Sequence, residues 1–197
     1  MVEHSGRTVP PAVADKLYTA TDLIAAQGLH KTKIDDIAAA SGVPKATLYY
    51  YFKGKDDILA FLFRDSLGAL ARDVAAAADA TGAGRDRLAA VIQVQIAHTM
   101  HRPATSLAVV GDLGRAIRLP ELATSVQQAF YEPIVRVLLA GADDGSLRPP
   151  ADPQSAAISI FGAAMMTALL HNAVDSDKTP AIIAGEVIAL VMDGVAP

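Results

Sequence analysis

One stretch constrains the fold more than any other part of the chain: residues 33–55 read KIDDIAAASGVPKATLYYYFKGK. Apolar residues at helical spacing are followed by Gly42, which is typical of a helix end, and then by Pro44. Proline suits the first turn of a helix because its missing N–H costs nothing there. The pattern therefore predicts two short helices joined by a tight turn, followed by a short basic segment that leads into a third helix. This is the layout of a helix-turn-helix, whose second helix enters the DNA major groove.

The outer face of the expected second helix carries polar side chains. Lys45, Ala46 and Tyr49 would lie near its start, where base edges are reached. Hydroxyl and lysine side chains nearby would reach phosphates, and a lysine at a helix N-terminus would join backbone N–H groups in binding an anion. The residues expected to contact DNA are Lys33, Lys45, Ala46, Thr47, Tyr49, Tyr50, Tyr51 and Lys55.

A structural helical hairpin with half-buried tyrosines would give a similar pattern, since such motifs also occur without DNA binding. The run IAAASGVPKATLYYYFKGKDDIL is more specific: with the preceding helix that ends at Gly28, it closely resembles the signature of TetR-family transcriptional regulators. The resemblance covers about residues 12–62. Tyr51 stands where the family often has histidine, and Ile24 where it commonly has phenylalanine. Further along, the resemblance rests on length, helix count and the G-x-x-x-G-x-L run at residues 141–147.

The resemblance implies an all-helical homodimer whose three N-terminal helices bind operator DNA. In this family the variable C-terminal body binds a small effector, and the last two helices usually form a four-helix dimer interface. Effector binding typically moves the fourth helix and changes the spacing of the two recognition helices, which releases DNA. We therefore expect an all-α fold of about nine helices. A helix-turn-helix DNA-binding domain would occupy residues 1–54, and a helical effector-binding and dimerisation domain residues 55–197.

Local signals predict where the N-terminal helices begin and end. An apolar stripe over residues 13–24 indicates one amphipathic helix, which Gly28 would end. Thr32 followed by Asp35 resembles a capping box with aspartate in place of the usual glutamate. Gly54 is expected to end the helix that starts at the proline of the turn.

The C-terminal half also reads as helix. A helix expected at about 120–140 contains Pro133, which should kink it or mark a boundary, because proline removes one helical hydrogen bond. Residues 141–153, GADDGSLRPPADP, have the composition of a loop. Two last helices are expected at about 154–174 and 179–194.

The helix expected at 154–174 is apolar enough to be compared with a membrane span, which needs about 20 predominantly apolar residues. It carries polar residues, among them Ser159, Thr167 and His171, and lacks aromatic or basic flanks. This favours a helix buried all round in a soluble protein. Its small residues repeat every four positions and would let another helix approach closely. We expect no membrane partner, and a two-fold homodimer through this helix and the one at 179–194.

Net charge alone argues against a nucleic-acid binder, because it is −4. The distribution changes this picture: residues 1–55 hold seven basic and five acidic residues, against ten and sixteen in the remainder. A mildly basic N-terminal segment followed by an acidic remainder fits a DNA-binding module joined to another domain. The chain has no cysteine, and its first residues lack the apolar segment of a secretory signal. We therefore expect a cytoplasmic protein.

Candidate effector-binding residues combine adaptable apolar side chains with a few polar anchors, as small-molecule sites do. The apolar ones would serve equally well as ordinary core. The candidates are Gln95, Met100, Arg115, Gln127, Phe130, Tyr131, Phe161 and Met165. The effector would be a small apolar or aromatic compound.

Other kinds of chemistry have little support. His98 and His101 could share a helix face, and Asp112 and His171 could join them, but no HExxH motif or carboxylate cluster accompanies them. We expect no metal site and no cofactor. Because the chain lacks a cysteine nucleophile, a G-x-S-x-G motif and a phosphate loop, we expect no enzyme. The prediction is a ligand-responsive repressor that binds a palindromic operator as a dimer. The alternative is a helical interaction module without sequence-specific DNA binding.

Overall fold

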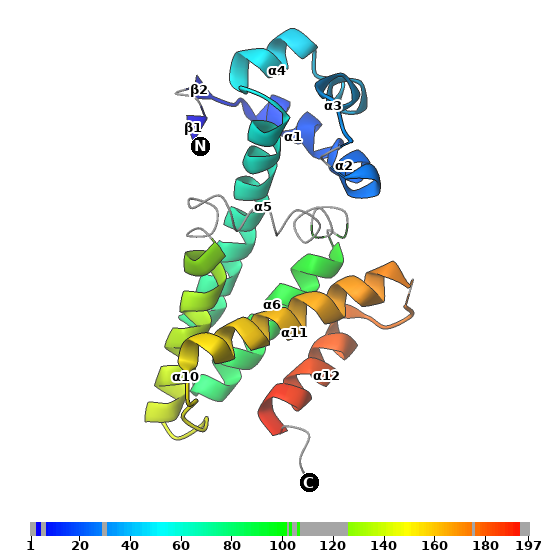
Figure 1. Cartoon of the computed structure of the whole chain (residues 1–197). Coiled ribbons are helices and arrows are strands. Elements are labelled where there is room, and N and C mark those ends of the chain that lie inside the picture. The colour runs from blue at the N-terminus through cyan, green and yellow to red at the C-terminus, as the bar shows by residue number, and fades with distance from the viewer. Residues whose placement is uncertain are drawn as a thin grey trace. The chain divides into compact units, whose positions relative to one another are not determined.

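The computed structural model describes residues 3–4, 7–28, 31–101, 103, 106, 126–174 and 176–193. The regular secondary structure of these residues is helical apart from one antiparallel pair of two-residue strands, β1 (Glu3–His4) and β2 (Arg7–Thr8) (Figure 1). The all-helical fold class is therefore confirmed. The chain divides into two compact units, an N-terminal unit of Met1–Leu67 with Ala104–Leu122, and a C-terminal unit of Gly68–Pro103 with Ala123–Pro197.

The N-terminal unit is built from short helices around one apolar core. They are α1 (Pro11–Tyr18), α2 (Thr21–Gln27), α3 (Ile34–Ser41), α4 (Lys45–Tyr51) and the first turns of α5 (Lys55–Ala78). Helix α3 packs against both α1 and α4. The buried apolar residues of this unit include Leu17, Ala20, Ile24, Ile37, Val43, Leu48, Phe52, Ile58, Phe61 and Leu62.

The single helix expected over residues 13–24 is wrong, because Thr19 and Ala20 separate α1 from α2. The hydroxyl of Thr19 lies 2.8 Å from the carbonyl oxygen of Lys16 and 3.0 Å from that of Ala40 in α3. Threonine hydroxyls compete in this way with the backbone bonds of a helix. The stripe is nevertheless buried from Leu17 to Ile24, and Val13 is half-buried, so the break changes the path of the chain and not its inward face.

The cap of α3 lies one residue later than expected. The N–H of Lys33 donates to the carboxylate of Asp36 at 2.8 Å, which is the reciprocal half of a capping box. The hydroxyl of Thr32 instead donates to the carbonyl oxygen of Gly28 at 2.8 Å. Gly28 has φ of +78°, so it ends α2 as predicted. Asp35 takes no part in the cap, and its carboxylate pairs with Lys45 of α4 instead.

Helix α4 ends earlier than expected, because Phe52 adopts an extended conformation with φ of −129°. Gly54 does not end α4. Its carbonyl oxygen accepts the N–H groups of Asp57 and Ile58 and so begins α5. The carboxylate of Asp57 also accepts the N–H of Lys53 at 3.0 Å. Two residues of the connection are therefore bonded to the first turn of α5.

The C-terminal unit is organised around α6 (Gly84–His101), which packs against three other helices (Figure 1). These are α10 (Glu132–Asp143), α11 (Pro153–Ala173) and α12 (Pro180–Asp193). A short π-helix, η1 (Gln127–Tyr131), precedes α10 and contacts α11. The change from η1 to α10 falls one residue before Pro133, so this proline marks a helix boundary as predicted. The buried apolar face of α6 consists of Leu88, Val91, Ile92 and Ile96.

The loop after α10 is bonded to the N-terminus of α6, in an arrangement that we call the Gly84–Gly141 latch. A Cβ on Gly84 would lie 2.3 Å from the Cα of Gly141. The carboxylate of Asp144 accepts the N–H groups of Gly84 and Ser146, both at 2.8 Å, and the hydroxyl of Ser146 accepts the N–H of Arg85 at 3.0 Å. The hydrogen bond from the Ser146 side chain, followed by that from the Gly84 N–H, holds the pKa of Asp144 below its usual value.

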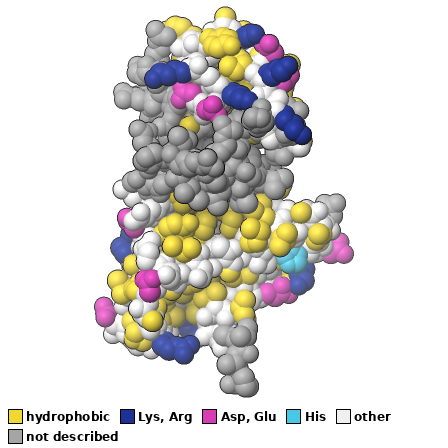
Figure 2. Space-filling model, in the orientation of Figure 1, with side chains coloured by type: hydrophobic (Ala, Val, Ile, Leu, Met, Phe, Trp, Pro, Cys, Tyr) yellow, Lys and Arg dark blue, Asp and Glu magenta, His cyan; other side chains and the backbone are white. Residues whose placement is uncertain are grey.

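Helix α11 is long and apolar enough, by length and composition alone, to cross a membrane. The expectation that it is buried all round is wrong for a single chain. Ala157, Ala164 and Ala168 are buried inside the C-terminal unit, whereas Met166 and Leu170 on another face are 48% and 58% exposed. Figure 2 shows hydrophobic side chains at the surface of this unit. The helix therefore has one packed face and one apolar face open to a partner.

The latch predicts a strong position dependence for glycine substitutions. Gly84→Ala should lower the free energy of unfolding by about 1–3 kcal/mol, because the added methyl group meets backbone that cannot move aside easily. Gly68→Ala in α5 is the matched control, since its Cβ would meet only the guanidinium of Arg72 at 3.6 Å. Thermal and urea unfolding followed by circular dichroism measures both. Equal stability of the two variants would contradict the close approach.

Candidate DNA-binding site and effector region

The turn between α3 and α4 is held by a left-handed glycine and one serine. Gly42 has φ of +64° and ψ of +17°, a conformation that glycine adopts without cost. The buried hydroxyl of Ser41 donates to the carbonyl oxygen of Ile37 at 2.6 Å and accepts the N–H of Val43 at 3.3 Å. The buried polar groups of the turn are thereby paired, and α4 has a defined direction relative to α3.

The inner face of α4 is fixed by apolar contacts. Leu48 and the following Phe52 are 1% and 2% exposed, and the ring of Phe52 meets that of Phe61 edge-on at 5.4 Å. The opposite face remains open, and Tyr49 and Tyr50 are each 55% exposed. The exposed residues of α4 are Lys45, Ala46, Tyr49 and Tyr50, all of them predicted DNA contacts.

Thr47 and Tyr51 differ from these four, because both are half-buried. The ring of Tyr51 packs edge-on against Tyr50 at 4.9 Å and lies 6.5 Å from that of Phe52. Tyr51 therefore joins the exposed aromatic face to the core. The alternative of half-buried packing tyrosines describes this one residue better than it describes its exposed neighbours.

An ion pair connects the start of α4 to α3. The ammonium group of Lys45 lies 2.6 Å from the Asp35 carboxylate, and both side chains are at least half exposed. The hydrogen bond to Asp35 raises the pKa of Lys45. Figure 2 shows basic and acidic side chains together on the visible face of the N-terminal unit. In the free protein this lysine is thus already paired, and DNA would have to compete with Asp35 for it.

Lys55 has a structural contact that the sequence pattern did not reveal. Its ammonium group donates to the carbonyl oxygen of the buried Thr32 at 3.0 Å, and so links the start of α5 to the segment before α3. Lys33, the N-cap of α3, is exposed. The proposed phosphate contacts of both lysines stay predictions.

The candidate effector residues belong mainly to three elements of the C-terminal unit, and Arg115 lies outside the described residues. The structure brings the three aromatic ones together: the ring of Phe161 lies 5.1 Å from that of Phe130 and 5.4 Å from that of Tyr131. Burial raises the pKa of the Tyr131 phenol. Gln127 is exposed and Met100 half-buried, and no described contact links either of them to this aromatic cluster.

Gln95 is the most unusual of these candidates. Its side chain is 1% exposed, and neither amide atom has a hydrogen-bond partner. Leaving a buried polar atom unpaired costs about 1–3 kcal/mol, so such groups call for an explanation. One turn further along α6, the hydroxyl of Thr99 donates to the backbone carbonyl oxygen of Gln95 at 2.8 Å and lies 3.5 Å from the sulfur of Met165. The unpaired amide is therefore a candidate anchor for a polar group on an apolar ligand.

No metal site is found among the described residues, where no three histidine, aspartate or glutamate side chains gather as ligands would. The Nδ1 atom of His101 lies 2.5 Å from the carbonyl oxygen of Ala97 in its own helix. His171 is half-buried, and its Nδ1 atom is buried without a partner. Asp112 lies outside the described residues.

A capped turn that presents one short, exposed, aromatic helix defines a helix-turn-helix DNA-binding protein. Comparison with known proteins is in agreement: residues 17–61 match the family described as bacterial regulatory proteins, tetR family. This match places the DNA-binding segment of the chain in that family, and the chain is a ligand-responsive, DNA-binding transcriptional regulator.

Relatives of similar length support this assignment. The chain is 24% identical over 188 residues to the fatty acid metabolism regulator protein of Bacillus subtilis, covering 94% of this chain and 96% of the relative. It is 27% identical over 141 residues to the transcriptional repressor KstR2 of Mycolicibacterium smegmatis, covering 69% and 67%. The structure of the regulator FadR from Bacillus subtilis in complex with stearoyl-CoA matches with a TM-score of 0.77 at 23% identity, over 94% of this chain and 98% of that one. This last likeness supports the fold.

The Lys55 contact predicts a loss of stability that is independent of DNA. Lys55→Met should lower the free energy of unfolding by about 1 kcal/mol, because the Thr32 carbonyl loses a charged donor. Lys53→Met is the control, since the side chain of Lys53 is exposed and only its backbone N–H is bonded. Urea unfolding without DNA gives both values. If the two variants unfolded at the same urea concentration as the native chain, this contact would have no structural role.

Proposed function

We propose that this protein is a cytoplasmic repressor, not an enzyme, that binds a palindromic operator as a homodimer and leaves it when an acyl-coenzyme A thioester binds. Residues 1–54 would bind DNA, and residues 55–197 would bind the effector and form the dimer. The observation that carries the proposal is the rigid turn that presents an exposed α4. The fatty acid regulator and the stearoyl-CoA complex among its relatives support the effector class.

Each subunit would place α4 in the major groove of one half-site. Lys45, Ala46 and Tyr49 near its start would reach base edges, after Lys45 exchanges Asp35 for DNA. Phosphates would be contacted by Lys33, Thr47, Tyr50, Tyr51 and Lys55. Two such helices must match half-sites about 34–36 Å apart, or a multiple of that distance. A modest change in their separation would therefore break both sets of contacts.

The dimer would form through the apolar side chains that α11 and α12 leave exposed. On a soluble protein, large apolar side chains gathered on adjacent helices indicate an interaction surface, and a two-fold axis pairs such a surface with itself. Small residues between them, Gly162 and Gly185, have no neighbour within 4 Å of an added Cβ and would let helices approach closely. The exposed apolar side chains are Ile158, Met166, Leu170, Ile182 and Leu190.

The acyl chain of the effector would pack near the aromatic cluster of Phe130, Tyr131 and Phe161 and near Met165. Gln95 would donate its amide N–H to the thioester carbonyl, which would pair one of its two unpaired buried atoms. Apolar walls with one or two placed polar groups are typical of small-molecule sites. The remaining candidates, Met100, Arg115 and Gln127, are proposed as further contacts.

Operator binding can be tested by fluorescence anisotropy with labelled DNA from beside the encoding gene. Tyr49→Ala should weaken binding at least tenfold, and Lys33→Ala, which removes a proposed phosphate contact, should reduce the slope of log affinity against log salt by about 1. Lys178→Ala, which removes a surface lysine paired with Glu186 at 2.6 Å, is the control. Saturation should require two chains per operator. Binding that ignores DNA sequence and the Tyr49 side chain would instead favour a helical interaction module.

If Gln95 binds the effector, its replacement should raise the stability of the protein and weaken its response to the effector. Gln95→Met should raise the melting temperature, because it removes two unpaired buried atoms, and should weaken the release of operator by stearoyl-CoA or a shorter acyl thioester about tenfold. Gln93→Met, on the exposed side of the same helix, is the matched control. Differential scanning calorimetry and anisotropy measure the two effects. Unchanged release by Gln95→Met would remove Gln95 from the effector site.

A further inference from the structure

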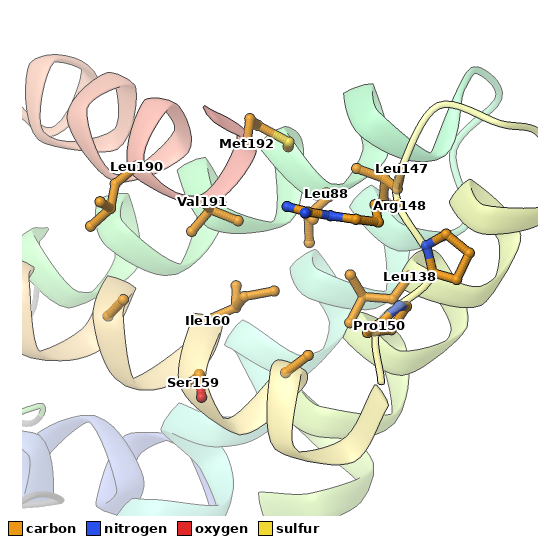
Figure 3. A pocket seen from close by; sticks show the side chains of 13 residues that line it. Leu88, Leu138, Leu147, Arg148, Pro150, Ser159, Ile160, Leu190, Val191 and Met192 are labelled. Carbon is orange, nitrogen blue, oxygen red and sulfur yellow. The ribbon is translucent and has the colours of Figure 1, made fainter. Parts of the chain in front are cut away.

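A cavity apart from the effector candidates lies in the C-terminal unit (Figure 3). Helices α6, α10, α11 and α12 bound it, together with the loop at residues 147–150. Its volume of about 460 Å³ is within the range of small-molecule sites. None of the described residues assigned above to the effector lines it, although Leu190, which we place on the dimer surface, does. The cavity is thus an additional place where a ligand could bind.

The walls of the cavity are apolar. Leu88, Leu138 and Ile160 each have less than a tenth of their surface exposed and come from three different helices. Val191 and Met192, in the last turn of α12, line the cavity as well (Figure 3). Such walls favour an apolar ligand body, because every apolar group transferred there leaves water.

Among the described residues that line the cavity, Arg148 alone is charged. Figure 3 shows its guanidinium extending from the loop toward Leu88 and Met192. It forms no ion pair or hydrogen bond with any described residue. The acidic residues closest in sequence are already engaged: Asp144 belongs to the latch, and Asp152 accepts the N–H of Gln154 at 3.0 Å as the N-cap of α11. The Arg148 side chain is exposed, and among the described residues no acidic group pairs with its positive charge.

The loop that carries Arg148 is held on both sides. The N–H of Leu147 donates to the carbonyl oxygen of Gly141 at 2.9 Å, and the Leu147 side chain fills the space that a Cβ on Gly141 would need. Pro149 and Pro150 follow, and their rings restrict the backbone. A ligand that pairs with Arg148 thus orders little additional backbone, which favours binding.

We propose that this cavity binds a monocarboxylate with an apolar body. Its carboxylate pairs with the Arg148 guanidinium, which offers two parallel N–H donors that match the two carboxylate oxygens. Its apolar body lies against Leu88, Leu138 and Ile160. Ser159, the other polar residue of the lining, already donates its hydroxyl to the carbonyl oxygen of Ser155 at 2.9 Å. Among the described lining residues, Arg148 is the cation and the Ser159 hydroxyl is already bonded. This lining suits a ligand with a single carboxylate better than a phosphate ester, which would need more donors.

Methyl NMR of protein labelled with ¹³C at its methionine methyl groups locates the ligand, because Met192 lines the cavity and Met100, Met165 and Met166 do not. Sodium decanoate is the probe, and Met192→Leu assigns the signal. Decanoate should shift the Met192 signal saturably, and Arg148→Gln should weaken that binding at least tenfold. Arg136→Gln, which removes an arginine paired with Asp79 at 3.3 Å, is the matched control and should bind decanoate like the native chain. Decanol should bind the native chain and Arg148→Gln equally weakly.

Two outcomes would overturn the proposal. In the first, decanoate leaves the Met192 signal unchanged or binds Arg148→Gln as well as it binds the native chain. In the second, the Met192 signal changes on dilution of the protein and not with decanoate, which would mean that a second copy of the chain fills the cavity. Operator affinity and thioester response of Arg148→Gln, measured alongside, should equal those of the native chain. These two measurements therefore distinguish failure of the carboxylate proposal from failure of the proposed regulatory function.

Discussion

The close approach of Gly84 to Gly141 is the constraint on which the C-terminal unit depends. With no side chain on either residue, the first turn of α6 touches the last turns of α10, and Asp144 and Ser146 then bond the N–H groups at the start of α6. Helix α6 in turn supplies Leu88 to the cavity and Gln95 to the proposed effector site. One glycine contact thus positions residues of both ligand sites.

The N-terminal unit also depends on a glycine, but for its backbone conformation rather than for a close approach. Gly42 lets the chain turn sharply, and the Ser41 hydroxyl pairs the polar groups that the turn exposes. Because Leu48 and Phe52 then anchor α4 in the core, Tyr49 and Tyr50 must face outward. Their exposure follows from the packing of their neighbours. Recognition by this unit therefore depends on buried contacts that never touch DNA.

The sequence was sufficient for the elements whose signals are local. The Gly42 turn, the Pro133 boundary and the inward stripe of the first two helices could all be read from residue type and spacing. The missed features depend on residues distant in sequence. The break at Thr19 involves the carbonyl of Ala40, and the Lys55 contact involves Thr32. Likewise, neither the unpaired amide of Gln95 nor the cavity at Arg148 has a local signal, because burial and cavities arise only when helices pack.

The ion pair between Lys45 and Asp35 explains why a single DNA-binding unit should bind the operator only weakly. Each unit has only a small excess of basic residues, and DNA that binds Lys45 must displace a carboxylate that already lies 2.6 Å away. The net electrostatic gain per subunit is therefore small. Two units joined through α11 and α12 make the second contact intramolecular, so that their binding free energies combine. The exposed apolar face of α11 would then matter to operator affinity as much as α4 itself.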